Sequence, residues 1–249
     1  MNAPGSALRW IRAACAAAGL ALLAQPAAAL CRQALALALD ISGSVDAGEY
    51  RLQIDGLAAA LEDPNVIDAF LAMPDAPVWL YVFEWAGLGT QRTLIAWSEV
   101  TTAEQLQGIA ARLRNQPRQP REVATALGRA MEFGADALAA RRDCWKLTLD
   151  ISGDGRSNIG VRPRELGSYQ NLAGVIVNAL IIGSDPEDSQ STSGEEIPKL
   201  ESYFRAEVIR GPDAFVVTAN GFEDYQRAMT RKLLREIEVL AVGQATPRR

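Results

Sequence analysis

Short, nearly continuous apolar runs alternate along this chain with segments of helical periodicity. The apolar runs include residues 34–40, 145–152 and 174–183, and turn-forming residues bound each of them. Strands of this kind are usually covered on both faces, as in parallel sheets whose strands are connected by helices. The alternation therefore predicts an α/β fold, doubly wound, with a mostly parallel six-stranded sheet and helices on both faces.

The boundaries of the expected elements follow from the points where the periodicity changes. The predicted strands cover residues 34–40, 78–86, 93–100, 145–152, 174–183 and 214–219. The predicted helices cover residues 47–63, 102–115, 124–142, 163–173 and 222–239. Pro64 is expected to end the first helix, because proline cannot continue a helix interior. Four tryptophans fall on strand patterns and are expected in the core: Trp79, Trp85, Trp97 and Trp145.

Residues 1–29 have the organisation of a secretory signal peptide. Arg9 and Arg12 precede an apolar segment from Ala13 to Leu23, and three alanines at 27–29 form a small-residue cleavage signal. The apolar segment is shorter than the roughly 20 residues that a membrane span needs. We therefore expect an exported protein, periplasmic or secreted, without a membrane span.

The rest of the chain is expected to form one domain, over residues 30–242, followed by a disordered tail over 243–249. Within this domain, residues 183–199 are polar, acidic and rich in turn-forming residues. This segment is expected to be a long surface loop at the rim of the sheet, where it either shapes binding or is a passive insertion.

Charge and composition exclude several classes of function. The formal net charge is −5, and loss of the two arginines of the signal peptide would make it −7. With no basic stretch, the chain is a poor candidate for binding nucleic acid. The chain contains no histidine, which excludes Ser-His-acid hydrolysis in its usual form and His-ligated zinc. Any metal site must therefore use oxygen ligands, which favours Mg²⁺, Mn²⁺ or Ca²⁺.

Oxygen-bearing side chains stand where three predicted elements meet their loops. Asp40-x-Ser42-x-Ser44 ends the first strand, Thr125 precedes a predicted helix, and Asp154 follows the strand over 145–152. In open α/β sheets, ligands bind outside the carboxyl ends of the strands. Two carboxylates and three hydroxyls would hold a hard cation and leave it partly electrophilic.

These residues resemble the metal-ion-dependent adhesion site of von Willebrand factor A-type domains. The resemblance covers nearly the whole mature chain and points to an uncharacterised exported bacterial family of such domains. It implies that Ser42 and Ser44 bind the ion directly, and that Thr125 binds it directly or through water. Asp40 and Asp154 would act mostly through water. One position departs from the pattern, because Ala124 stands where such domains usually have glycine before the threonine.

The same residues have structural interpretations. Asp46 and Glu49 are spaced as a helix capping box, a role compatible with metal binding by Ser44. Thr125 would suit the N-cap of the helix that follows it.

The resemblance also implies that the strands over 34–40 and 145–152 are parallel neighbours. Cys31 lies nine residues before Asp40, whereas Cys144 lies ten before Asp154 and only six before Asp150. Equal rises along neighbouring strands would then bring the cysteines together at one end and Asp40 and Asp154 together at the other. This implies a Cys31–Cys144 disulfide, with two buried free thiols as the alternative. Asp150 is then expected either to support the metal ligands without binding the ion itself or to have a structural role.

These residues predict a binding function and no enzymatic activity. A cation bound at the strand ends would capture an acidic group, Asp or Glu, of a partner protein. Asn158 is expected at the rim of this site. One alternative is an oxygen-ligated metal hydrolase, for which Asp150 or Glu84 would be the base in the absence of histidine. Another is a structural domain with a vestigial metal site.

Overall fold

The structure is a computed structural model that describes residues 31–183 and 197–238, except residue 121. The predicted signal peptide, the predicted tail and most of the 183–199 loop lie outside the described residues. No helix among the described residues is long and apolar enough to cross a membrane.

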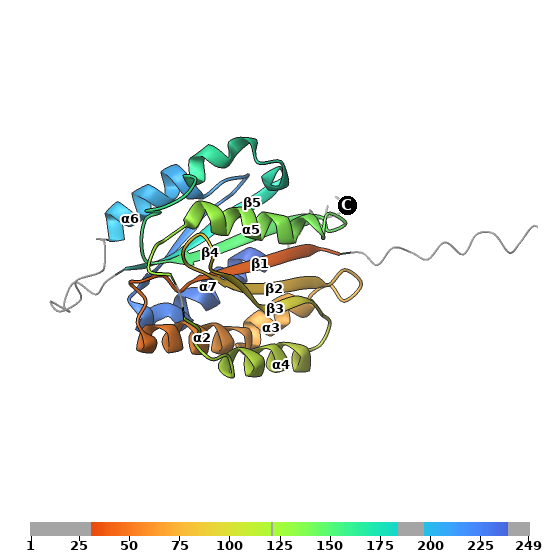
Figure 1. Cartoon of the computed structure of the whole chain (residues 1–249). Coiled ribbons are helices and arrows are strands. Elements are labelled where there is room, and N and C mark those ends of the chain that lie inside the picture. Colours follow the sequence, from red (N-terminus) through yellow and green to blue (C-terminus); the bar gives the residue numbers. More distant parts are fainter. Residues whose placement is uncertain (1–30, 121, 184–196, 239–249) are drawn as a thin grey trace, which may run out of the picture. The chain divides into compact units, whose positions relative to one another are not determined.

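The described chain forms the predicted α/β fold around one six-stranded sheet (Figure 1). The strand order is β3-β2-β1-β4-β5-β6; β3 runs antiparallel to β2 and the other neighbouring strands pair in parallel. The strands are β1 (Gln33–Asp40), β2 (Val78–Trp85), β3 (Gln91–Val100), β4 (Lys146–Gly153), β5 (Val175–Gly183) and β6 (Val216–Asn220).

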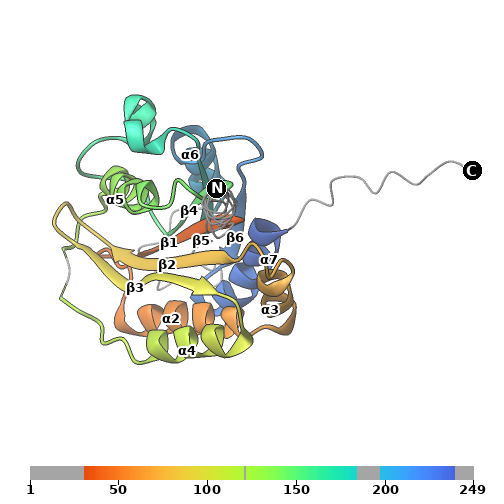
Figure 2. The same ribbon diagram turned by 90° about the vertical axis from the view of Figure 1, so that its right-hand side faces the viewer.

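Helices cover both faces of the sheet, as Figures 1 and 2 show. One face carries α2 (Ala47–Leu61), α3 (Pro64–Leu71), α4 (Ala103–Arg114) and α7 (Tyr225–Ile237). The other carries α5 (Leu127–Ala139), α6 (Ile197–Tyr203) and a π-helical turn over Phe204–Val208. Alternate residues of β1 serve the two cores, with leucines toward α2 and alanines toward α5.

Several expected boundaries are wrong in a physically instructive way. The first helix ends at Leu61, before Pro64, and Pro64 is itself the first residue of α3. At that position the missing N–H of proline removes no hydrogen bond from the helix. The Asp63 side chain caps α3 by accepting from the N–H groups of Asn65 and Val66. Residues 197–199 of the predicted loop begin α6.

The helix predicted over 163–173 is also wrong. Two short 3₁₀ turns, Pro163–Ser168 and Gln170–Leu172, occupy this stretch, and Tyr169 between them is extended. Gly167, Ser168 and Asn171 are poor helix formers, so the local sequence does not favour one continuous helix here.

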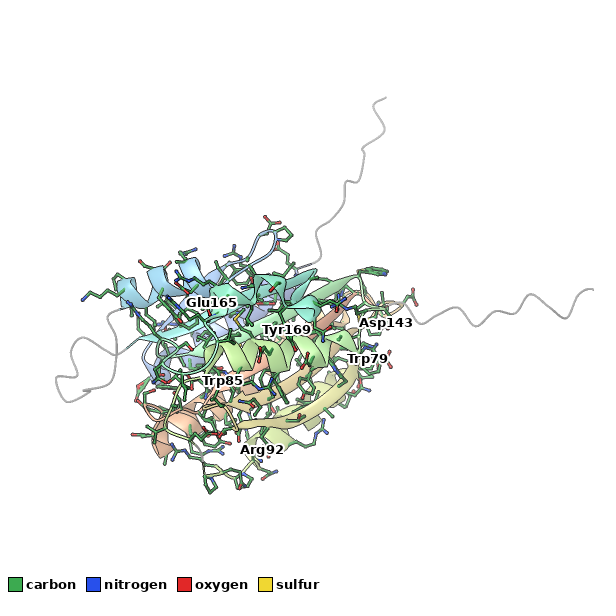
Figure 3. The ribbon with its side chains drawn as sticks, turned by 45° about the horizontal axis from the view of Figure 1, so that its top comes forward. Trp79, Trp85, Arg92, Asp143, Glu165 and Tyr169 are labelled. Atoms are coloured by element: carbon green, nitrogen blue, oxygen red, sulfur yellow. A yellow bond between two sulfur atoms is a disulfide. The ribbon has the colours of Figure 1, made fainter. Side chains whose placement is uncertain are left out.

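Trp145 contradicts the expectation that all four tryptophans are core residues. It lies before β4 and is 58% exposed. Trp85, at the end of β2, is fully buried, while Trp79, near its start, is partly buried (Figure 3). Trp97 is partly buried as well. An aromatic residue at the edge of a strand-like sequence is therefore not always buried by a neighbouring helix or strand.

The pairing of β1 with β4 brings the two cysteines together. Gln33 pairs with Lys146, so Cys31 and Cys144 stand side by side two residues earlier. They form the expected disulfide, with their Cα atoms 4.5 Å apart and 113 residues apart in sequence.

A buried ionic cluster anchors α7 to the sheet. Lys232 Nζ lies 2.7 Å from Asp150 Oδ2 on β4 and 2.7 Å from Glu236 Oε1 on its own helix. Asn178 of β5 also donates to Glu236 Oε1, and the Lys146 ammonium donates to the Glu236 carbonyl. Burial, and to a lesser extent the charge of Glu236, raises the pKa of Asp150 to about 7, although Lys232 opposes the shift.

We predict that loss of the disulfide destabilises the domain without changing its fold. In the chain-entropy model, a cross-link across a loop this long contributes on the order of 4–5 kcal/mol, and removal of native disulfides usually costs about 2–5 kcal/mol. The double variant Cys31→Ala/Cys144→Ala should lose stability in that range in urea denaturation. Reductant should destabilise the wild type and leave the double variant unchanged. Equal stability of the two proteins would contradict the prediction.

We predict that Asp150 makes the domain more stable as pH falls from about 8 toward 5. Because its folded pKa lies above the ordinary value, the folded state binds the proton more tightly than the unfolded chain. The free energy of unfolding should therefore rise as Asp150 protonates, with a slope no steeper than about 1.4 kcal/mol per pH unit for one proton. Asp150→Asn, which leaves Lys232 paired with Glu236, should flatten this slope in pH-dependent urea melts. An unchanged slope would contradict the assignment.

Candidate metal centre

Asp40 ends β1 at the carboxyl edge of the sheet and is fully buried. Its Oδ1 accepts a 2.7 Å hydrogen bond from the Ser42 N–H, and its backbone carbonyl accepts from Gln53 Nε2 at 2.9 Å. Its Oδ2 has no hydrogen-bond partner in the part of the chain that the structure describes. A Cβ at Gly153 would lie 3.3 Å from this Oδ2, so glycine there leaves room beside the carboxylate.

The two serines connect Asp40 to Asp154. The Ser42 and Ser44 hydroxyl oxygens lie 3.4 Å apart. The Ser44 hydroxyl donates to Asp154 Oδ1 at 2.8 Å. The loops after β1 and β4 therefore meet through side-chain oxygens, as strand ends at one edge of a parallel sheet allow.

Thr125 is held in place through its backbone. Asn158 Oδ1 accepts from the Thr125 N–H at 2.9 Å, and the Thr125 carbonyl accepts from the Asn158 N–H at 2.9 Å. The Ser157 hydroxyl also donates to this carbonyl, at 3.3 Å. Thr125 is not a helix cap: the N-cap of α5 is Ala126, and no side chain caps that helix.

A backbone contact joins the Thr125 loop to the loop after Asp40. The Gly43 N–H donates to the Val123 carbonyl at 2.9 Å. A Cβ on Gly43 would lie 2.4 Å from Val123 Cγ1 and 2.8 Å from Val123 O, so only glycine fits without a shift. The sequence did not reveal the role of Gly43, and it placed Ser157 only in a stretch, residues 155–158, expected to shape partner choice. Both roles depend on a partner loop distant in sequence.

Both carboxylates are destabilised in their charged forms. Burial, and then the negative charge of Asp154, raises the pKa of Asp40 well above its ordinary value. Burial also raises the pKa of Asp154, and the hydrogen bond from Ser44 opposes the shift. A nearby cation would relieve both penalties.

The residues present fit a hard divalent cation. The donor set is made of carboxylate and hydroxyl oxygens, the ligands that Mg²⁺, Mn²⁺ and Ca²⁺ prefer. The buried, unpartnered Asp40 Oδ2 is the kind of atom that an ion or an ion-bound water would satisfy. A divalent cation held by these residues would supply electrostatic attraction for a further anionic ligand.

Two other residues suggested by the sequence face away from Asp40. Asp150 pairs with Leu37 in the β1–β4 register and lies on the α7 face, with Lys232. Glu84 is paired with Arg92 at 2.7 Å and lies near Tyr50 of α2. Asn158, in contrast, lies at the rim and positions Thr125. The expected Asp46–Glu49 capping box is also present at the start of α2.

The fold is that of a von Willebrand factor A-type domain, as comparison with solved structures shows. A proximal thread matrix protein from the mussel byssus, with a zinc-occupied metal-ion-dependent adhesion site, is 17% identical with a TM-score of 0.59. The comparison covers 84% of this chain and 49% of the byssal protein, so this chain spans about half of that protein's length.

Two other structures share the fold. A paralogue of ArnB from Sulfolobus acidocaldarius, VWA2, is 14% identical with a TM-score of 0.53, covering 82% of this chain and 45% of that one. The manganese-loaded TRAP protein of Plasmodium vivax is 15% identical with a TM-score of 0.51, covering 83% and 73%.

The chain belongs to a family described as "protein of unknown function (DUF1194)", whose model matches residues 30–241. No curated protein matches the chain in sequence.

We predict that Gly43→Ala disturbs the contact between the two loops. The added methyl must displace Val123, and overpacking of this kind costs typically about 1–3 kcal/mol. The matched control is Gly108→Ala on α4, where a Cβ meets no atom within 4 Å and alanine favours the helix. In urea denaturation, the first substitution should destabilise the protein and the second should not. Wild-type stability of Gly43→Ala would contradict the packing described here.

Proposed function

We propose that this protein is an exported protein-binding module that depends on a divalent cation. Asp40, Ser42, Ser44, Thr125 and Asp154 would hold the ion, and the ion would capture an Asp or Glu side chain of a partner protein. Mg²⁺ is the ion we propose first, with Mn²⁺ or Ca²⁺ as substitutes of the same ligand preference.

One observation carries this proposal: two buried carboxylates are linked through Ser42 and Ser44, and Asp40 Oδ2 has no hydrogen-bond partner among the described residues. Like charges held in a buried place are costly unless a cation neutralises them. The hydroxyl ligands add no charge, and the two carboxylates would act mostly through water, so the ion would stay partly electrophilic. The ion would therefore still attract a carboxylate from outside.

The solved structures support the choice of a metal-dependent site. Their titles describe a zinc-occupied adhesion site in the byssal protein and manganese in the Plasmodium vivax protein. These statements concern those proteins, and the identity of the ion and of the partner in this chain is our proposal.

Export is proposed from the first 29 residues together with the disulfide. The order of positive, apolar and small residues is that of a secretory signal. A disulfide between Cys31 and Cys144 suits the periplasm or the exterior, where disulfides persist.

A binding function is favoured over metal-dependent hydrolysis. The sequence offered Asp150 and Glu84 as the base of such a hydrolase. Asp150 is paired with Lys232 of α7, and Glu84 is paired with Arg92 of β3. Neither α7 nor β3 carries a candidate ligand. General base catalysis needs a group within hydrogen-bond reach of the reacting water.

We predict that Mg²⁺ or Mn²⁺ stabilises the oxidised protein against heat, relative to chelator. A ligand at about 100 times its dissociation constant adds roughly 2.7 kcal/mol. For a domain of this size, about 2–4 °C per kcal/mol gives a rise of about 5–10 °C. Asp40→Asn should abolish the rise, and in chelator it should be at least as stable as the wild type, because a neutral amide replaces a disfavoured charge.

Asp55→Asn is the matched control, since Asp55 is exposed on α2 and paired only with Arg51. It should keep the full response to metal. If saturating metal does not raise the wild-type melting temperature, the structural alternative with a vestigial site takes the place of the binding proposal.

A further inference from the structure

Three large apolar side chains are exposed on loops at the same edge of the sheet as the candidate metal centre. Leu88 is 46% exposed, Val123 78% and Ile159 40%. Only two other large apolar side chains in the described part of the chain are as exposed, and both lie elsewhere: Leu52 on α2 and Trp145 before β4.

Val123 lies directly against the loop that carries the serines. The position of a Cβ on Gly43, between Ser42 and Ser44, is 2.4 Å from Val123 Cγ1. Val123 also precedes Thr125 by two residues. Its side chain is therefore placed beside three of the five proposed ligands while most of its surface remains in solvent.

Leu88 and Ile159 extend the apolar surface around the Thr125 loop. Leu88 Cδ2 lies 2.8 Å from the position of a Cβ on Gly160, the residue after Ile159. The turn that carries Leu88 is held by Glu122, whose carboxylate accepts from the Gly89 N–H at 2.8 Å and the Thr90 hydroxyl at 3.1 Å. Because Glu122 immediately precedes Val123, the Leu88 turn is bound to the Val123 segment on one side and contacts the Ile159 segment on the other.

The exposed apolar surface of these three residues would lose its contact with water if a partner covered it. Exposed apolar side chains that gather on neighbouring loops among polar groups are a common mark of a protein-binding site. Here the hydrogen bonds of Glu122 and the contact of Val123 with Gly43 hold the apolar residues in place. A partner carboxylate drawn to the cation would bring its neighbouring side chains against these loops.

We propose that Leu88, Val123 and Ile159 form an apolar subsite that receives a large aliphatic or aromatic side chain next to the partner's Asp or Glu. This inference rests on the proposed function, and it adds a sequence preference to it. The cation would select the carboxylate, and the apolar subsite would select its neighbours. The partner segment is therefore an acidic residue flanked by large apolar residues, in an otherwise unconstrained sequence.

The test uses two N-acetylated, C-amidated peptides with a single carboxylate each, Gly-Leu-Glu-Leu-Gly and Gly-Ser-Glu-Ser-Gly. Their dissociation constants for the oxidised protein are measured by NMR titration in saturating Mg²⁺ and in chelator. The leucine peptide should bind about tenfold more tightly in Mg²⁺, which is about 1.4 kcal/mol. Neither peptide should bind in chelator.

Leu88→Ser/Ile159→Ser should weaken binding of the leucine peptide toward the level of the serine peptide. It should leave the serine peptide and the stabilisation by Mg²⁺ unchanged, because neither residue supplies a proposed ligand. Leu52→Ser is the matched control, since Leu52 is 41% exposed and lies outside the three loops. It should preserve the tenfold preference.

The outcomes separate this inference from the proposed function. Equal, Mg²⁺-dependent binding of the two peptides would overturn the apolar subsite and leave carboxylate capture standing. A leucine preference that survives Leu88→Ser/Ile159→Ser would also overturn it. Stabilisation by Mg²⁺ without binding of either peptide would overturn both carboxylate capture and the subsite. Absence of any response to Mg²⁺ would overturn the proposed function itself.

Discussion

The parallel pairing of β1 with β4 is the constraint on which the rest of the structure depends. Its register brings Cys31 beside Cys144 at one edge of the sheet and Asp40 beside Gly153 at the other. Because parallel strands rise equally, a cross-link at one end and a meeting of loops at the other follow from the same alignment. The disulfide thus stabilises the pairing that assembles the candidate metal centre.

Electrostatics and packing have opposite effects at this edge. Asp40 and Asp154 are both buried, and burial disfavours their charged forms. The loops nevertheless hold both carboxylates close together, through the Ser44 hydroxyl and the contact of Gly43 with Val123. Such an arrangement lowers the stability of the folded domain when no cation is bound. The proposed cation would raise that stability on binding, as expected of a site that serves binding.

The sequence predicted the fold more reliably than the details of the elements. Near-continuous apolar runs predicted the six strands, and the Asp46–Glu49 capping box is present at the start of α2 as its spacing indicates. The helix expected over 163–173 is wrong, because its apolar spacing is helical but Gly167, Ser168 and Asn171 are poor helix formers. Trp145 failed because a strand pattern does not reveal that the strand begins after it, where no element covers the side chain.

The sequence by itself determined the chemistry that this chain can offer: no histidine, three cysteines, and oxygen-bearing side chains at strand ends. Periodicity and residue type are local properties, so they can be read without coordinates. The tertiary structure decided which groups meet. It placed Asp150 with Lys232 beneath α7, made Asn158 a support for Thr125, and brought Leu88, Val123 and Ile159 around one edge. These relations join residues far apart in the chain, and only strand register and loop packing bring them together.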